Sequence, residues 1–378
     1  MLYTKSDNYD KFICTAGTCP GSCCAGGWQI MIDDAHMDLY ASDTGFPELN
    51  ERLREGVDRR EECFFQDEKG ICRMLDPDGL CSIQRALGEA ALCDTCRVYP
   101  RHTEEFEDVR EYSLSLSCPE AARLILERTE PLAFTEWETE ESDDPEEYGD
   151  FDFLLYSQLT DARRRIFRTI QDRSISFAEK ARRIAAFAEK LQDCADQGRM
   201  FEMDELIYGS EEDTETANAV LEPAEPETDP FGKNLFSKLF ELEMLKPGWL
   251  EIIDRTWNAW DPQGAPDSQG APEISGPQTA ADVQDPQLFA EEEIMAEQLL
   301  MFWIYTYFCG AVYDGWIYSK VMLALCSTWW IFRIRDANSF PGGLIEAAYR
   351  YAREIEHSDE NLNDLEDWFM ERRGMASE

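Results

Sequence analysis

The feature that most constrains this chain is a group of four cysteines within eleven positions near its N-terminus. The stretch CTAGTCPGSCCAGGWQI (residues 14–30) contains Cys14, Cys19, Cys23 and Cys24 and continues to a tryptophan. Disulfides, a metal or redox chemistry could each explain such close thiols. Thirteen cysteines in 378 residues are too dilute for a disulfide scaffold, and residues 1–13 lack the apolar run of a signal peptide. We therefore expect a cytoplasmic protein with a metal site.

A second group of cysteines completes the set of candidate metal ligands. Zinc sites usually combine two short paired motifs, whereas a 4Fe-4S cluster accepts four thiolates at irregular spacing. The irregular spacing here fits a 4Fe-4S cluster at least as well as zinc, which stays open as the alternative metal. Adjacent side chains usually point apart, so Cys23 and Cys24 are not expected to share one small site. The candidate ligands are Cys14, Cys19, Cys23, Cys24, Cys72, Cys81, Cys93 and Cys96.

The net charge limits the classes of partner that the chain can bind, and the hydropathy pattern limits the kind of fold. The net charge of −43 disfavours nucleic acid and anionic membrane surfaces and favours a cationic partner, although acidic surfaces also serve solubility alone. The most apolar stretch, residues 299–337, is interrupted by Asp314 and Lys320, which favours a buried helical pair over a membrane span.

The organisation expected from these patterns is a mainly α fold, with a cysteine-rich metal-binding N-terminal region and a helical C-terminal region. Helical periodicity marks residues 151–173 and residues 176–197, and the second segment opens with a capping box from Ser176 to Glu179. Residues 135–150 are acidic and are expected to form a solvated connection. The expected regions are a cysteine-rich domain (1–130), a helical region (131–208), an acidic Pro-rich linker (209–230), a helical pair (231–260), a disordered insertion (261–287) and an aromatic-rich helical region (288–378).

Several quoted segments resemble the flagellin lysine-N-methylase family. In the front half these are CPGSCCAGGWQIMID, residues 70–101 and SLSCPEAARLIL (115–126), and that half is related to a zinc- or iron-chelating domain with a CxxCxxCC signature. AEQLLMFWIYTYF (296–308) and YAREIEHSDENLNDLE (351–366) resemble the family's C-terminal helices. The resemblance places the family's cysteines on the eight candidate ligands and on Cys118, although the spacing from Cys14 to Cys23 departs from strict CxxCxxCC and Cys63 has no counterpart.

The resemblance implies methyl transfer from S-adenosylmethionine to lysine side chains of flagellin, with a 4Fe-4S cluster in the N-terminal region. The CxxxCxxC loop of radical enzymes is absent, because Gly26 stands where its third cysteine would be. A neutral lysine amine is already a nucleophile, so displacement needs no radical. A non-enzymatic iron-sulfur or zinc module that binds a basic, lysine-rich protein partner is the alternative.

Candidate site residues come from three places in the chain. His357 beside Glu356 is the candidate catalytic pair, and a plain helix end is its alternative. Tyr99 and Arg101 follow the last clustered cysteine and are candidates for binding the cofactor, unless Arg101 only compensates cluster charge. The sulfonium could also meet aromatic faces near Tyr313 and Asp314. An ordinary aromatic core is the alternative for that segment: Trp303, Tyr305, Tyr307, Tyr313, Trp316 and Tyr318.

Overall fold

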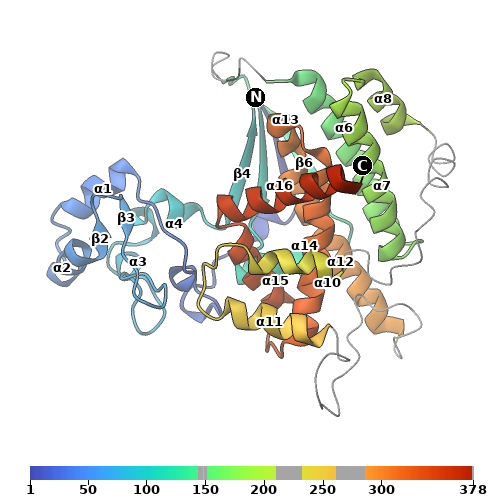
Figure 1. The fold of residues 1–378 in the computed structure, drawn as a ribbon. Helices are drawn as coiled ribbons and strands as arrows, with labels where there is room; N and C mark the ends of the chain where they lie inside the picture. The colour runs from blue at the N-terminus through green and yellow to red at the C-terminus, as the bar shows by residue number, and fades with distance from the viewer. Residues whose placement is uncertain (144–147, 149–150, 210–231, 261–285, 377–378) are drawn as a thin grey trace, which may run out of the picture.

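The computed structural model describes residues 1–143, 148, 151–209, 232–260 and 286–376. A cysteine-rich lobe, residues 14–98, projects from one side of a larger, mostly helical body (Figure 1). A mainly α fold with a cysteine-rich N-terminal region is therefore confirmed. The expected linker at 209–230 and insertion at 261–287 lie outside the described residues, apart from Gly209 and the start of a helix at Pro286.

The lobe consists of short helices joined by loops. Its helices are α1 (Asp34–Ala41), α2 (Pro47–Gly56), α3 (Ser82–Leu87) and α4 (Asp94–Val98), with 3-10 helices η2 (Ala16–Thr18), η3 (Cys23–Ala25) and η4 (Glu89–Ala91). A two-stranded pair joins β2 (Val57–Asp58) to β3 (Cys63–Phe64). A small apolar core around Leu53, Phe64 and Met74 supports these elements.

The helices of the body enclose the main hydrophobic core. They are η1 (Tyr9–Lys11), α5 (Pro119–Leu126), α6 (Phe153–Ile170), α7 (Phe177–Asp196), α8 (Met200–Tyr208), α10 (Lys233–Phe236), η5 (Ser237–Phe240), α11 (Trp249–Ala259), α12 (Pro286–Tyr307), η6 (Phe308–Gly310), α13 (Ala311–Asp314), α14 (Ile317–Ala337), α15 (Gly343–Ile355) and α16 (Asp359–Ala376). The predicted helices at 151–173 and 176–197 are confirmed as α6 and α7, and the Ser176 hydroxyl caps α7 by accepting from the Glu179 N–H.

The apolar segment forms the centre of the body, as expected. α14 packs against α7, α12, α15 and α16, which explains why it is hydrophobic on nearly all sides. Lys320, which interrupts the apolar run, forms ion pairs with Asp314 at 2.8 Å and with Glu366. Within the described residues, no helix is both long and apolar enough to cross a membrane.

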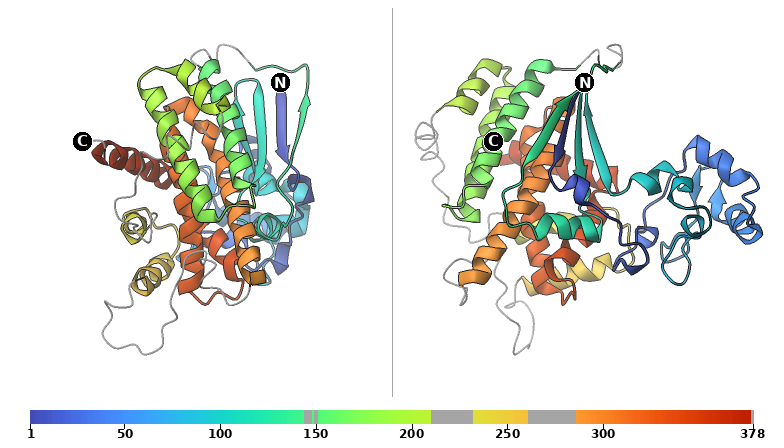
Figure 2. Two further views of the ribbon diagram at one scale, coloured as in Figure 1. Left: turned by 90° about the vertical axis from the view of Figure 1, so that its right-hand side faces the viewer. Right: turned by 180° about the vertical axis from the view of Figure 1, so that it is seen from behind.

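A four-stranded sheet that the sequence patterns did not predict covers one side of the helices (Figure 2). Its strand order is β4 (Arg101–Phe106), β5 (Val109–Leu114), β1 (Leu2–Ser6) and β6 (Phe134–Glu138). β1 runs parallel to β5, and the other two pairs are antiparallel. The expectation of a solvated connection at 135–150 is wrong for its first residues, because they pair with β1; most of their side chains are nevertheless exposed.

Candidate functional site

Three cysteine-bearing segments converge in the lobe. η3 carries Cys23 and Cys24, and the Cys24 carbonyl accepts a 2.7 Å hydrogen bond from the Cys72 N–H. Cys93 is the N-cap residue of α4, which contains Cys96. The Cys93 N–H donates to the buried Tyr40 hydroxyl at 2.9 Å, so a lobe-core residue fixes the start of α4.

The thiols of these segments lie close together. The Cys23 and Cys24 side chains are hydrogen-bonded to each other, so the expectation that they point apart is wrong. Cys93 and Cys96 form a second hydrogen-bonded pair. Cys96 is close enough to Cys24 and Cys23 for charge interaction, and Cys72 is similarly close to Cys81, Cys23 and Cys93.

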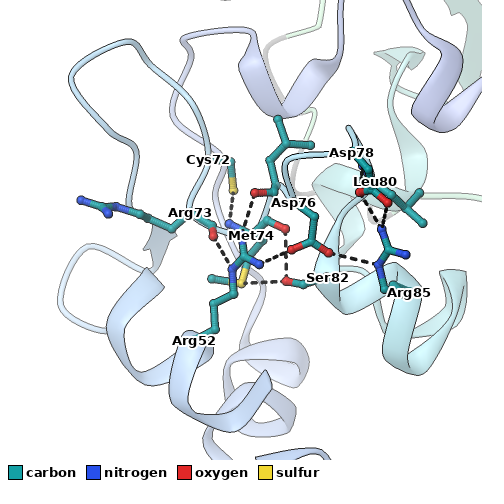
Figure 3. A network of polar contacts seen from close by, with 10 residues as sticks. Arg52, Cys72, Arg73, Met74, Asp76, Asp78, Leu80, Ser82 and Arg85 are labelled. Atoms are coloured by element: carbon teal, nitrogen blue, oxygen red, sulfur yellow. Dashed lines mark hydrogen bonds and ion pairs between the residues drawn. The ribbon is translucent and has the colours of Figure 1, made fainter. Parts of the chain in front are cut away.

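An arginine network holds the loop that carries Cys72 and Cys81 (Figure 3). Arg52 of α2 donates to the carbonyls of Arg73 and Leu75, each at 2.6 Å, and pairs with Asp76. Arg85 of α3 completes the network through Asp76 and Asp78. This fixes the backbone between the two cysteines from both sides.

The remaining cysteines of the front half are more dispersed. Cys14 is exposed and Cys19 is half-buried, and the Cys14 thiol is close enough to Cys23 and Cys19 for charge interaction. Cys118 is buried near Cys19 and Cys23. Among the described side chains, the group whose ligand atoms all lie within 4.8 Å is instead Asp33, His36 and Asp94. Its geometry is that of a helix cap, because the Asp33 carboxylate accepts from the N–H groups of His36 and Asp94.

The C-terminal end of α15 joins the body to the cysteine lobe. Arg353 donates from Nε to the Ser117 carbonyl at 2.9 Å and from Nη2 to the Gly21 carbonyl at 2.5 Å. Its guanidinium lies 5.5 Å from the Trp28 ring centre and 5.0 Å from that of Tyr349. One buried side chain thus connects the CPGSCC loop to the helical segment that resembled the family.

His357 is inserted between the two parts of the protein. Its ring stacks on Trp28 with centres 4.0 Å apart, and its Nε2 lies 2.8 Å from the Ser117 hydroxyl oxygen. The Tyr99 hydroxyl lies 3.0 Å from the same oxygen. Burial, together with the charge of Arg353, lowers the pKa of His357 to about 3, so its ring is neutral at physiological pH.

Glu356 lies beside it in a set of hydrogen-bond donors. Its carboxylate accepts from the Tyr307 hydroxyl at 3.0 Å, from the Ser117 N–H at 3.1 Å and from the Ser115 hydroxyl at 3.2 Å. Burial raises the pKa of Glu356 to about 7, against the opposing effect of the Tyr307 hydrogen bond and the charge of His102. Glu356 therefore changes its protonation state near neutral pH.

β4 brings two more titratable side chains to this place. The Nε2 of His102 lies 2.6 Å from Glu104, and the side chains are 39% and 27% exposed, respectively. Burial lowers the pKa of His102, but Glu104 and Glu356 raise it more, so it ends above its ordinary value. Solvent thus reaches the site beside β4. We call the whole set the junction cluster: Trp28, Tyr99, His102, Glu104, Ser115, Ser117, Tyr307, Glu356 and His357.

The structure brings only some of the predicted site residues together. Tyr99, Glu356 and His357 meet in the junction cluster. Arg101 instead lies over the rings of Tyr9 and Phe12 at the start of β4. The other two predicted residues lie toward the far end of that strand: the Tyr313 hydroxyl donates to the Glu105 carbonyl at 2.5 Å, and Asp314 pairs with Lys320.

Sequence reasoning did not single out most of the residues that surround Glu356. Ser117 contacts Glu356, His357 and Arg353, although it is separated from them by more than 230 positions. His102 was available as one of only three histidines in the chain. Of the aromatic segment, Trp303 and Tyr305 are buried in the core, whereas Tyr307 reaches the cluster.

Replacing Arg353 with methionine is expected to lower the free energy of unfolding by about 2–4 kcal/mol, because two carbonyl groups lose a charged donor. Arg350→Met is the matched control. Arg350 lies on the exposed side of α15 and pairs with Glu346, so its loss should cost less than about 1 kcal/mol. Urea denaturation measures both values. Equal effects of the two changes would show that Arg353 does not hold the junction.

Comparison with known proteins identifies relatives of the chain. Residues 163–377 match the FliB lysine N-methylase C-terminal domain. The lysine-N-methylases of Salmonella typhimurium and Salmonella choleraesuis are each 31% identical, over 132 and 131 residues, which is 33% of this chain and 33% and 32% of theirs. The flagellar biosynthetic protein FliU of Salmonella muenchen is 30% identical over 131 residues, or 77% of that protein and 33% of this chain.

These matches differ in how much of each protein they cover. The chain matches about a third of the length of the two lysine-N-methylases. No solved structure matches it. The domain match spans more than half of the chain and includes Tyr307, Arg353, Glu356 and His357. The chain therefore belongs to the FliB lysine N-methylase family.

Proposed function

We propose that this protein is a methyltransferase that uses S-adenosylmethionine to methylate lysine side chains of flagellin. The observation that carries the proposal is Glu356: a carboxylate with a pKa of about 7, beside a solvent-accessible edge, in a family whose relatives are named lysine-N-methylases. The flagellar name of the Salmonella muenchen relative supports the choice of flagellin.

Glu356 is proposed to accept the proton of the substrate lysine. A lysine ammonium has an ordinary pKa of about 10.4 and cannot act as a nucleophile until it loses a proton. An ordinary glutamate, with a pKa of about 4.3, is a far weaker acceptor than Glu356. Partial desolvation of the lysine beside the cluster lowers its own pKa and brings the two values closer.

His357 and Ser117 are proposed to position this carboxylate. With a pKa of about 3, His357 is a poor proton acceptor, so the base assigned to it from the sequence moves to Glu356 in this proposal. The Ser117 N–H fixes Oε2 of Glu356, while its hydroxyl is held between His357 and Tyr99. The carboxylate is thereby oriented before any substrate arrives.

The side chains around the cluster fit a sulfonium cofactor. Tyr99 and Tyr307 bring aromatic rings, which attract cations, to the cluster beside the Glu356 carboxylate. The Ser113 hydroxyl, across the strand pair from His102, is buried and has no hydrogen-bond partner among the described residues, so it can serve a ligand. When bound, S-adenosylmethionine would supply an electrophilic methyl group to which a neutral amine can bond in line, with S-adenosylhomocysteine as the leaving group.

A 4Fe-4S cluster is the proposed metal group of the lobe, and a single zinc ion is the alternative. Zinc–sulfur bonds of about 2.3 Å require four thiolates roughly 3.8 Å apart. No three described thiols lie within 4.8 Å of one another, so at most two of them have the spacing that zinc requires, whereas a 4Fe-4S cluster accepts four thiolates at irregular spacing. Cys23, Cys24, Cys93 and Cys96 are the proposed ligands, and Cys72 and Cys81, which are close enough to Cys23 for charge interaction, are the proposed substitutes. When bound, the cluster cross-links the segments that support Trp28 and Tyr99.

The negative charge of the chain is proposed to attract the lysine-bearing substrate. Raising the salt concentration from about 0.05 to 0.5 M should lower kcat/KM severalfold and leave kcat at saturating flagellin nearly unchanged, because screening slows association and not the chemical step. Initial rates at both salt concentrations measure this. An equal fall of both constants would contradict steering.

The direct test is to incubate purified protein with methyl-labelled S-adenosylmethionine and unmodified flagellin, and to locate the label by peptide mass spectrometry. Label on lysine side chains supports the proposal. A protein that binds flagellin but transfers no label would instead be a non-enzymatic module for a basic partner.

A further inference from the structure

β4 is an edge strand of the sheet, and it borders the junction cluster. Within the described part of the chain, the sheet order places β5 on one side of β4 and no strand on the other. Figure 1 shows this edge facing the side of the body from which the cysteine-rich lobe projects. The free edge therefore lies where His102 and Glu104 are open to solvent.

The register shows which backbone groups this edge offers. Phe106 pairs with Val109 across a two-residue turn, and the Ser115 N–H donates to the Pro100 carbonyl at 2.7 Å. In an antiparallel pair, bonded and non-bonded positions alternate, so the N–H and C=O groups of Arg101, Thr103 and Glu105 point away from β5. The Glu105 carbonyl already accepts a hydrogen bond from the Tyr313 hydroxyl. Among the described residues, the backbone groups of Thr103 have no hydrogen-bond partner.

Side chains along β4 alternate between the two faces of the sheet. His102 and Glu104 belong to the row that faces the helices and the cluster, where Glu356 acts on His102 electrostatically. A side chain on an added neighbouring strand would lie with its Cβ about 4.5–5.5 Å from that of its partner on β4. A lysine in that row would reach the carboxylates of the cluster.

The negative charge around the free edge of β4 favours a positively charged partner. The strand and its turn carry Glu104, Glu105, Glu107 and Asp108, and the whole chain has a net charge of −43. A second copy of the chain would bring like charges together, whereas a lysine-bearing segment complements them. An exposed edge is a common site for binding extended peptides through main-chain hydrogen bonds.

We propose that β4 binds an extended, lysine-bearing segment of the protein substrate as a fifth strand, with the lysine facing His102, Glu104 and Glu356. This inference rests on the proposed function for the fate of the lysine. Main-chain bonds to Thr103 supply affinity without regard to sequence, and the inner row selects lysine. Tyr313 ends the docking surface at Glu105.

Thr103→Pro tests the main-chain contact. Proline removes the outward N–H of Thr103 but no bond to β5, so the sheet should persist. The control is Glu136→Pro on β6, which forms the opposite edge of the sheet. The Thr139 N–H donates to the Met1 carbonyl, and bonded positions alternate along an antiparallel pair. The Glu136 N–H therefore also points away from the sheet. The probe is a threonine-rich peptide with one central lysine. Thr103→Pro should weaken its binding about tenfold, the loss expected for one or two hydrogen bonds, and the control should not.

Hydrogen exchange on the unaltered protein gives an independent measurement. The peptide should protect the amides of Thr103 and Glu105 and leave that of Glu136 unchanged. A peptide N-methylated along its backbone keeps the lysine but should bind about tenfold more weakly. Undiminished binding of that peptide, or no protection at Thr103 with peptide bound, would overturn the inference.

The methylation assay separates this inference from the proposed function. Nα-acetyl-lysine amide has no strand to add, so Thr103→Pro should leave its methylation unchanged while methylation of the peptide falls. If the peptide protects the β4 amides from exchange but neither acceptor is methylated, the proposed function is refuted and the binding of the peptide to β4 is supported. If both acceptors are methylated, and the parent protein and Thr103→Pro do so at equal rates, the docking of a strand on β4 is refuted and the proposed function is not.

Discussion

Glu356→Gln is expected to lower kcat for lysine methylation at pH 7 by about 100-fold or more, because a positioned proton acceptor contributes at least that factor. Glutamine keeps the size of the side chain, and its single carbonyl oxygen can still accept from the Ser117 N–H, while its NH2 group would face the Tyr307 hydroxyl oxygen. In the parent protein kcat should rise as the pH passes about 7, where Glu356 ionises. In Glu356→Gln this rise should disappear, and activity should recover only toward the lysine pKa of about 10.4.

Glu354→Gln is the matched control for this experiment. Glu354 is also buried, with its pKa raised to about 7 by burial, but its carboxylate accepts from the Leu245 N–H on another side of α15. Its replacement should leave kcat within a fewfold of the parent value. A parent-like rate in Glu356→Gln at pH 7 would contradict the role of Glu356.

The free energies of unfolding of the parent protein and of Glu356→Gln provide a further test of the role of Glu356. Because its folded pKa exceeds the unfolded value, its contribution to stability is full below the unfolded pKa of about 4.3 and is lost as the pH rises through about 7. Glu356→Gln should therefore be at least as stable as the parent above pH 7. A large loss of stability there would mean that low activity reflects unfolding.

Cys96→Ser is expected to abolish the brown absorbance and most of the acid-labile sulfide of anaerobically purified protein. Cys96 is paired with Cys93 and lies near Cys23 and Cys24, so its loss removes a thiolate from the centre of the proposed ligand set. The lobe has only a small apolar core, so its loops should become sensitive to protease without the cross-links of the cluster. Iron, sulfide and proteolysis assays measure these effects.

Cys194→Ser is the control for the cluster experiment. Cys194 is buried in α7, far along the chain from the lobe cysteines, and its replacement should leave the iron and sulfide content unchanged. Colourless parent protein that holds one zinc ion and no sulfide would exclude the iron-sulfur cluster. Methylation by such protein would leave the proposed function intact, since displacement needs no iron.

The helices of the body follow from local sequence patterns. The apolar stripes of α6 and α7 recur at helical spacing, and Ser176 caps α7 through a bond to a residue only three positions away. The apolar run that forms α14 is equally local. Periodicity and capping are readable from sequence because their partners are close along the chain.

The four-stranded sheet could not be predicted from local sequence patterns. β1 and β6 are short, and β1 pairs with strands more than 100 residues away. Their acidic and polar residues carry no strong period-two pattern, because β6 is exposed on an edge. Pairing of this kind depends on which segments the packed helices bring together, and that information is spread over the whole chain.

The sequence by itself determined that thiols gather near the N-terminus, that the chain is mainly helical and that Glu356 and His357 adjoin each other. Only the tertiary structure decided their surroundings. Burial against Ser117 and Tyr307 gives Glu356 its pKa near neutrality, and burial against Trp28 and Arg353 keeps His357 neutral. A pKa depends on desolvation and on neighbouring charges, and here these neighbours lie up to about 330 positions apart in sequence, so they exist only in the folded chain.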